Sequence, residues 1–388
     1  MSEINVTLTR TPDITDEIAE DSVAMPALLG PWALMWRKFR RHRVAYVSLW
    51  VVVFIYGMAM FGEVLTTTNL EETNVRAPFA PPMGIDLFVE NADGTSNFLL
   101  HAKGLKLELN RVEMRRTFVQ DPEKIIPLGF FVKGHPYKLL GLIPMDRHLF
   151  GPKNPRDRVY FFGADRLGRD IFSRIVMGTR ISMSIGLVGV VVSLVIGISL
   201  GGISGYYGGW IDNIIQRLIE FIRSIPTIPL WMGLAAAIPL GWPPLYTYFV
   251  VTLIVSMIGW TGLAREVRGK FLSLRNEDFI VAARLDGLTD WEVIWKHMVP
   301  SFSSHIIASL TLAVPLMILA ETSLSFLGIG LQPPIVSWGT LLKEAQNIRT
   351  IIQAPWLLIA PGSVIVIAVL ALNFLGDGLR DAADPNAH

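Results

Sequence analysis

Long apolar runs constrain this 388-residue chain more than any other feature of its sequence. A helix needs roughly 20 apolar residues to cross the hydrocarbon core of a bilayer, and six runs are close to that length or above it. The composition agrees, with 51% hydrophobic residues, 17% charged residues and a mean hydropathy of +0.45. The predicted spans are residues 44–65, 181–204, 214–240, 246–263, 306–327 and 356–375.

The third run differs from the others. Arg217, Glu220 and Arg223 lie in its first half, which indicates that part of it lies at the membrane interface. Pro226 and Pro229 follow, and proline removes a backbone donor and clashes with the preceding turn. We therefore expect this span to be kinked.

A basic cluster at residues 36–43 comes directly before the first predicted span. Basic residues favour the cytoplasmic side, so six spans put both termini in the cytoplasm. Binding of nucleic acid or of anionic lipid is the alternative for such a cluster, but the position beside an apolar run favours a role in orientation, and a net charge of only +1 gives no reason to expect nucleic acid. The predicted organisation is a tail with the basic cluster (1–43), a first span (44–65), an external segment with a small subdomain (66–180), a membrane core (181–377) with a cytoplasmic loop (265–300), and a second tail (378–388).

The external segment carries strand signals. Residues 85–89 and 98–100 flank Asp93-Gly94, which is a hairpin signal. Apolar and polar residues then alternate over 105–110, which predicts a strand. We predict a small, partly β external subdomain, either a docking surface for a partner or a lid.

The polar stretch 278–300 predicts two short helices joined at a glycine. Gly287 tolerates the left-handed conformation that closes a helix. Thr289 and Glu292 have the spacing of a capping box, which starts a second helix. Trp291 and Trp295 then share one face of that helix.

We call residues 278–300 the elbow. Ala282 and Ala283 are small enough for a partner to approach the backbone closely, and Pro300 marks the junction with the next span. The alternative is an ordinary cytoplasmic loop with an interfacial tryptophan pair.

A second charged stretch, residues 162–174, leads into the second predicted span. Asp165 and Asp170 are spaced to form ion pairs with Arg169 and Arg174. The alternative is a turn that only sets the angle of the following helix.

Glu321 is an acid within the fifth predicted span, and a buried acid there is a candidate functional residue. We expect it either to line a pore or to pair with an arginine of the outer loop. A structural residue at the interface is the alternative.

No pattern typical of an enzyme is present in the sequence. Gly269-Lys270 is followed by Phe271, so the phosphate-binding loop G-x-x-x-x-G-K-[ST] is missing. There are no cysteines, and the seven histidines are scattered. We therefore expect no catalytic residue, no metal site and no bound cofactor.

The elbow resembles the EAA loop of ABC-importer permeases. Ala282, Ala283, Gly287 and Pro300 match that loop, whereas Val281 replaces its leading glutamate. The resemblance implies that the elbow docks on a cytoplasmic ATPase. The residues implied in coupling are Ala282, Ala283, Asp286, Gly287, Trp291 and Pro300.

Residues 162–174 resemble the GTDxxGRDxxSR signature of dipeptide, oligopeptide and nickel permeases, with Ala164 in place of threonine. The residues of this periplasmic motif are Gly163, Asp165, Gly168, Arg169 and Asp170. Residues 205–212 and 321–339 are also similar to that family. The resemblance is greatest to its C-type second permease.

This resemblance implies an all-α polytopic protein of the type I ABC importer kind, with six transmembrane helices and a partly β external insert. It implies a bacterial inner-membrane location and ATP-driven import of dipeptides, oligopeptides or related small solutes, with Glu321 as a gate candidate. The implied partners are a homologous second permease, two ATP-binding subunits that hold ATP and Mg²⁺, a periplasmic substrate-binding protein and the lipid bilayer. An ion-gradient-driven secondary transporter and a membrane-anchored sensor are the alternatives.

Overall fold

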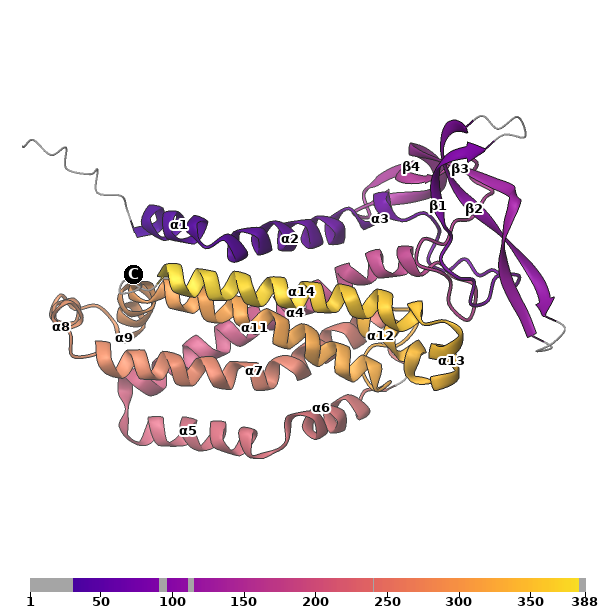
Figure 1. Ribbon diagram of the computed structural model, residues 1–388. Helices are drawn as coiled ribbons and strands as arrows, with labels where there is room; N and C mark the ends of the chain where they lie inside the picture. Colours follow the sequence, from indigo (N-terminus) through magenta and orange to yellow (C-terminus); the bar gives the residue numbers. More distant parts are fainter. Residues whose placement is uncertain (1–30, 91–95, 111–114, 240, 384–388) are drawn as a thin grey trace, which may run out of the picture.

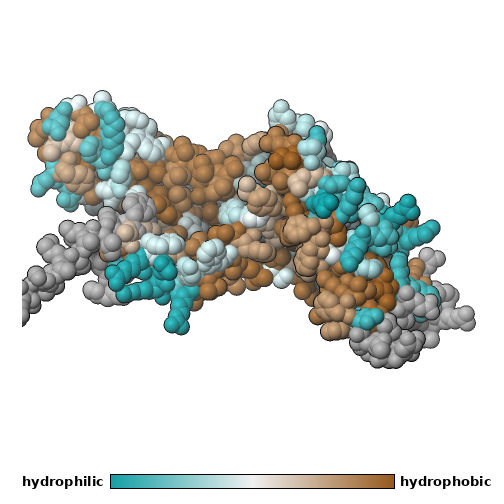
Figure 2. All heavy atoms as spheres, turned by 90° about the horizontal axis from the view of Figure 1, so that it is seen from above, coloured by the Kyte–Doolittle hydropathy of each residue, from teal (hydrophilic) through white to brown (hydrophobic). Residues whose placement is uncertain are grey.

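The computed structural model describes residues 31–383 except 91–95, 111–114 and 240. Its helices form one elongated bundle, and a β-sheet lies beyond one end of that bundle (Figure 1). An apolar band crosses the middle of the bundle and hydrophilic side chains gather at both ends (Figure 2). This distribution suits a protein whose middle faces hydrocarbon.

Five helices in the described part of the chain are long and apolar enough to cross a membrane. They are α2 (Arg43–Met60), α4 (Ile171–Tyr207), α7 (Pro244–Leu274), α11 (Ser303–Phe326) and α14 (Trp356–Ala383). A bent pair brings the number to six if it is counted as one span. All five correspond to predicted runs, but α4, α7 and α14 continue well past them into polar sequence, which a count of apolar residues does not detect.

The third predicted run is the bent pair. Helix α5 (Gly209–Ser224) and helix α6 (Thr227–Ala236) meet at 85°. The break comes at Ile225, which is extended, and at Pro226, because a residue before proline avoids the helical conformation. The predicted kink is therefore confirmed, and it is a complete break between two helices.

The first predicted span is also divided. Helix α1 (Pro31–Arg41) carries basic residues in its last turn, and His42 caps α2 by accepting a hydrogen bond from the Ala45 N–H at 3.1 Å. Helix α2 ends at Met60, and a single turn, α3 (Gly62–Leu65), completes the predicted run. The helical region of residues 44–65 is thus two elements.

Small residues allow the close packing of α4 on α7. Gly197, Gly201 and Gly205 recur every four residues along one face of α4. A Cβ added at Gly201 would lie 2.8 Å from the Ala264 Cα, and one at Gly205 would lie 2.6 Å from the Phe271 Cβ. Helices in membranes associate through such small-residue faces, because lipid provides no hydrophobic drive.

The external segment forms a four-stranded antiparallel sheet in the order β1-β2-β3-β4. The strands are β1 (Ile85–Glu90), β2 (Ser96–Asn110), β3 (Arg115–Leu139) and β4 (Ile143–Pro152). The predicted hairpin is confirmed by the pairing of Val89 with Asn97, although its Asp93-Gly94 turn lies outside the described residues. The predicted strand over 105–110 is part of β2. The partly β insert is therefore present.

A pair of short helices lies at each end of the bundle (Figure 1). Helices α12 (Trp338–Lys343) and α13 (Ile348–Gln353) lie near the sheet, joined by a single 3₁₀ turn (Glu344–Gln346). Helices α8 (Asp278–Leu285) and α9 (Asp290–Glu292) lie at the opposite end of the bundle (Figure 1). The two charged stretches singled out in the sequence therefore lie at opposite ends of the molecule.

Candidate functional site

The elbow has the helix–glycine–helix form that the sequence predicts. Gly287 follows α8 with φ +81°, and its N–H donates to the Arg284 carbonyl at 3.1 Å. The capping box is present, since the Thr289 hydroxyl accepts from the Glu292 N–H at 3.3 Å and Glu292 Oε2 accepts from the Thr289 N–H at 3.1 Å. Hydrogen bonds from Lys296 and Thr289 lower the pKa of Glu292 to about 2, so this cap is charged at neutral pH.

The second helix of the elbow is wider than expected. Only Asp290–Glu292 is α-helical, and Val293–Met298 is a π-helix followed by α10 (Val299–Ser301). Pro300 lies in α10 and has no N–H to bond the Lys296 carbonyl, which favours a change of hydrogen-bond register before it. Trp291 and Trp295 still contact each other, with ring centroids 5.6 Å apart.

The two small residues of the elbow face opposite ways. Ala283 is buried against the bundle, whereas Ala282 is exposed, as are Asp286 and Gly287. Four large apolar side chains of the elbow are exposed, and together we call them the elbow face. Its members are Phe279, Val281, Leu285 and Trp291, of which Leu285 is the most open at 83% exposed.

Hydrogen bonds fasten the elbow to the end of α4. The hydroxyls of Tyr206 and Tyr207 donate to the two carboxylate oxygens of Asp290 at 2.6 and 2.9 Å. Arg284 Nε donates to the Tyr206 hydroxyl at 3.1 Å, and its guanidinium lies 4.7 Å from the centre of the Tyr206 ring. The hydrogen bonds from Tyr206 and Tyr207 lower the pKa of Asp290. Sequence analysis missed this contact, since 83 residues separate Tyr207 from Asp290.

An ion-pair cluster lies at the other end of α4, and we call it the outer cluster. Asp165 is fully buried and accepts from Arg169 Nε at 2.6 Å and from Arg174. Glu344, from the 3₁₀ turn after α12, pairs with the same two arginines at 3.1 and 3.0 Å. The predicted network therefore exists, with Asp165 and Arg174 buried at its centre, and it includes Glu344, which no local pattern predicts.

Asp170 was wrongly predicted as a member of that network. It is the N-cap of α4, where it accepts from the backbone N–H groups of Phe172 at 3.3 Å and Ser173 at 2.9 Å. The Thr67 hydroxyl is its third donor, at 3.2 Å. Asp165 pairs with both arginines, which leaves Asp170 to cap the helix. Burial raises the pKa of Asp170 to about 6.

The two glycines of the same motif shape its turn. Gly163 has φ +79° and lies against the Trp356 ring, and Gly168 has φ +71° and lies against the Asn74 backbone. Neither position has room for a side chain.

Glu321 is fully buried. Within the described residues its carboxylate accepts hydrogen bonds from the hydroxyls of Ser182 at 3.3 Å, Ser325 at 2.7 Å and Ser337 at 2.7 Å. These serines come from α4, α11 and the N-cap of α12. Three hydroxyls thus stand where we expected an outer-loop arginine.

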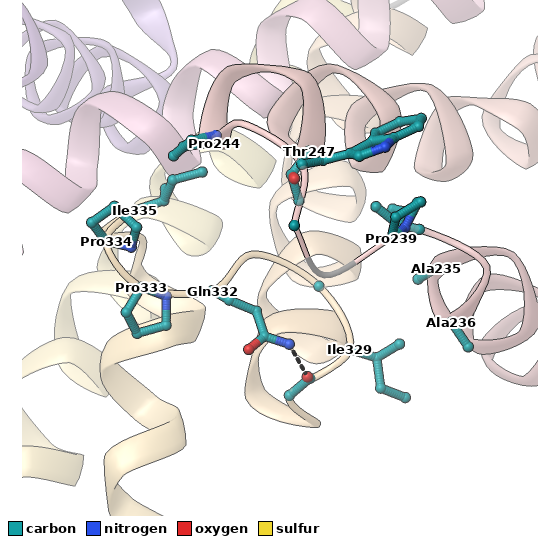
Figure 3. Close-up of a pocket in the computed structure, with 15 residues that line it drawn as sticks. Ala235, Ala236, Pro239, Pro244, Thr247, Ile329, Gln332, Pro333, Pro334 and Ile335 are labelled. Atoms are coloured by element: carbon teal, nitrogen blue, oxygen red, sulfur yellow. Dashed lines mark hydrogen bonds between the residues drawn. The ribbon is translucent and has the colours of Figure 1, made fainter.

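A cavity of about 570 Å³ opens between the α6–α7 loop and the segment after α11 (Figure 3). Its lining is mostly apolar, with Pro239, Trp242 and Ile335 among its residues. Gln332 brings an amide to it, and that amide donates to the Gly328 carbonyl at 2.8 Å. None of the predicted site residues lines this cavity. Among the described residues no three histidine or acidic side chains are grouped to hold a metal ion.

Comparison with known proteins adds family evidence. Residues 171–388 match the family model described as the binding-protein-dependent transport system inner membrane component. Residues 30–82 match the model of the N-terminal TM domain of oligopeptide transport permease C. The first match alone covers more than half of the chain.

Curated relatives agree. The chain is 40% identical to the glutathione transport system permease protein GsiD of Pectobacterium atrosepticum, over 64% of this chain and 79% of that protein. It is 36% identical to the oligopeptide transport system permease protein OppC of Bacillus subtilis, over 61% and 75%. It is 29% identical to the dipeptide transport system permease protein DppC of Lactococcus lactis, over 95% and 94%.

A solved structure also matches, the inward-facing MetNI methionine ABC transporter. The TM-score is 0.42 at 18% identity, over 55% of this chain and 97% of that chain. The family models and the curated relatives show the family of this chain without this structural match. The chain therefore belongs to the family of binding-protein-dependent transport system inner membrane components and is a permease subunit of the ABC importer kind.

Proposed function

We propose that this chain is the C-type permease that moves dipeptides or oligopeptides into the cytoplasm by alternating access. The relatives that it matches are named for glutathione, dipeptide and oligopeptide transport, which supports small peptides as the substrate class. ATP and Mg²⁺ bind on two partner subunits. Family membership favours this function over an ion-gradient-driven transporter or a membrane-anchored sensor.

The observation that carries the proposal is the elbow face. The side chains of Phe279, Leu285 and Trp291 are apolar and exposed. The segment that carries them is held in one geometry by the capping box and by the hydrogen bond from Tyr206 to Asp290. Exposed apolar patches on a polar loop mark protein contact sites. The partner is an ATP-binding subunit, and closure of the two ATP-binding subunits pushes the elbow.

The basic residues of α1 support a position of the elbow on the cytoplasmic side of the membrane. Helix α1 carries Lys38, Arg40 and Arg41 in its last turn and lies at the same end of the bundle as the elbow and the C-terminal end of α14 (Figure 1). Excess basic residues favour the cytoplasmic side of an inner membrane. The sheet then lies in the periplasm, where a substrate-binding protein delivers peptide to this chain and a second permease.

Glu321 has a structural part in the outer gate in this proposal. It gathers hydroxyls from α4, α11 and the start of α12, so it fastens three elements near the outer end of the bundle. Glu321→Gln keeps the shape and weakens the hydrogen bonds, and we expect a gate that closes poorly, with ATP hydrolysis raised relative to peptide uptake. Unchanged uptake and hydrolysis would remove Glu321 from the gate.

The test begins with purification of the tagged chain in mild detergent. We expect a second permease, two ATP-binding subunits and vanadate-sensitive ATP hydrolysis. Leu285→Asp should remove the ATP-binding subunits, whereas Leu87→Asp, at an exposed leucine of the sheet, should retain them. A chain that takes up peptide on an ion gradient, with no ATP-binding subunit, would contradict the proposal.

A further inference from the structure

The turn between β3 and β4 is apolar where such turns are usually polar. Leu139 pairs with Ile143, and Leu140-Gly141-Leu142 closes the hairpin. Leu142 is 81% exposed, and Leu140 and Ile143 are also exposed. Exposed turns normally carry Gly, Asn, Asp or Ser, because these residues form local hydrogen bonds and tolerate left-handed backbone. Here Leu140 itself has φ +51°. We call residues 139–143 the hairpin tip.

Contacts with α4 give the level of each neighbouring segment along the bundle. The Thr67 N–H donates to the Ser173 hydroxyl at 3.0 Å, near the start of α4. Two turns further along α4, Arg180 forms an ion pair with Glu63 at 2.6 Å and donates to the Ala59 carbonyl at 2.8 Å. The chain from Thr67 back to Glu63 therefore runs about 10 Å toward the apolar middle of the bundle.

The hairpin follows the same direction. Gly151 lies beside the Thr67 side chain, and α3 packs against both β3 and β4 (Figure 1). Further along the hairpin, Tyr137 of β3 pairs with Met145 of β4, and burial and then the charge of Glu63 raise the pKa of Tyr137. Residues 140–142 lie at least three residues beyond Tyr137, which is about 10 Å farther toward the middle of the bundle. The tip thus extends past the Glu63–Arg180 pair.

That level is where the lipid-facing surface begins. Trp50 and Phe54 of α2 are exposed apolar residues on the side of the ion pair toward the middle of the bundle, and Met60 is exposed at the level of the pair. The tip therefore continues a surface that already faces hydrocarbon. Lys138 and Arg147 are exposed near the base of the tip. Basic side chains at that height meet lipid phosphates.

We propose that the hairpin tip inserts into the outer leaflet of the bilayer. Leu140, Leu142 and Ile143 enter the acyl boundary, and Lys138 and Arg147 stay among the headgroups. Apolar side chains on otherwise polar segments bind membranes to a depth of about 5–10 Å in this way. The anchor fixes the sheet against the membrane surface and so sets the height at which a docking protein meets it.

The chain has no cysteine, so a single introduced cysteine carries a nitroxide without background. We would reconstitute the complete importer with Leu142→Cys in vesicles of phosphatidylethanolamine and phosphatidylglycerol. Collision rates with oxygen, which concentrates in lipid, and with a nickel chelate, which stays in water, report the depth. The control is Leu107→Cys, at a partly exposed position of β2. Leu107 lines a cavity together with Asn74, and the Asn74 N–H donates to the carbonyl of Leu167, which precedes the outer end of α4.

We expect the oxygen-to-nickel collision ratio at position 142 to exceed that at position 107 several-fold. Equal ratios at the two positions would show that the tip lies in water and would overturn the proposal. Protection of position 142 from both reagents would show that another protein subunit covers the tip, and this would overturn it as well.

Discussion

Gly287 offers the most direct test of the elbow, because the effect of its backbone conformation can be separated from the effect of the space around it. It has φ +81°, and a Cβ added there would meet nothing within 4 Å. Substitution therefore acts only through the backbone. Gly262 in α7 also has nothing within 4 Å of an added Cβ but is in an ordinary helix. Gly262→Ala is thus the matched control.

The expected size follows from the left-handed conformation. An ordinary L-residue there costs roughly 1–2 kcal/mol, asparagine costs less, and a β-branched residue costs more. A difference of 1–2 kcal/mol changes a conformational equilibrium by a factor of about 5–30. We therefore expect the coupling of uptake to ATP hydrolysis to be reduced least by Gly287→Asn, more by Gly287→Ala and most by Gly287→Val. Gly262→Ala should change the stability by no more than about 1 kcal/mol.

The assay is peptide uptake and ATP hydrolysis by the reconstituted importer, measured for all four variants. Loss of the elbow geometry should reduce the peptide taken up per ATP hydrolysed, with the subunits still assembled. Normal uptake by Gly287→Val would refute the reasoning. Equal losses for Asn, Ala and Val would also refute it, because they would show that backbone conformation is not the cause.

Three further predictions concern the stability of the chain. Gly201→Ala forces α4 and α7 apart and should destabilise the chain by about 1–3 kcal/mol, whereas Gly362→Ala, with open space around it, should be neutral; the melting temperature in detergent distinguishes them. Asp165→Asn leaves two arginines around Glu344 alone and should cost about 3–5 kcal/mol, whereas Asp86→Asn, in an exposed pair, should leave the melting temperature nearly unchanged. Burial, and then the charge of His148, lowers the pKa of His135 to about 4, below its ordinary 6.5. The folded hairpin then binds fewer protons than the unfolded chain, so its stability is complete above about pH 6.5 and falls as the pH drops toward 4. Hydrogen exchange of β3 and β4, corrected for intrinsic rates, should show this loss, and His135→Gln should remove it.

Local signals predicted the local structure well. The capping box of Thr289 and Glu292 needs only residues three apart, and the alternation over 105–110 needs only one strand, so both are confirmed. Partners distant in the chain could not be predicted in this way. Glu344 joins the outer cluster from 170 residues beyond Arg174, and no spacing rule connects them.

Two features were within reach of the sequence. The spacing of four between Gly197, Gly201 and Gly205 is a known sign of close helix packing in membranes, and it marks the α4–α7 contact. The leucines around Gly141 are unusual for a hairpin turn and mark the tip that we assign to lipid. Both signals became meaningful only when the neighbouring segment was known.

Helix α4 connects the two charged regions and makes them interdependent. Its 37 residues extend about 55 Å, from the N-cap Asp170 beside the outer cluster to Tyr206 and Tyr207 at the elbow. Because α4 contains no proline and packs closely on α7, we expect it to transmit displacement along its axis. A push on Asp290 therefore reaches the contacts around Glu344 through one element. Asp165→Asn tests this link, because it loosens the outer end alone: a changed rate of ATP hydrolysis would show that the two ends move together, and an unchanged rate in an assembled importer would show that they move separately.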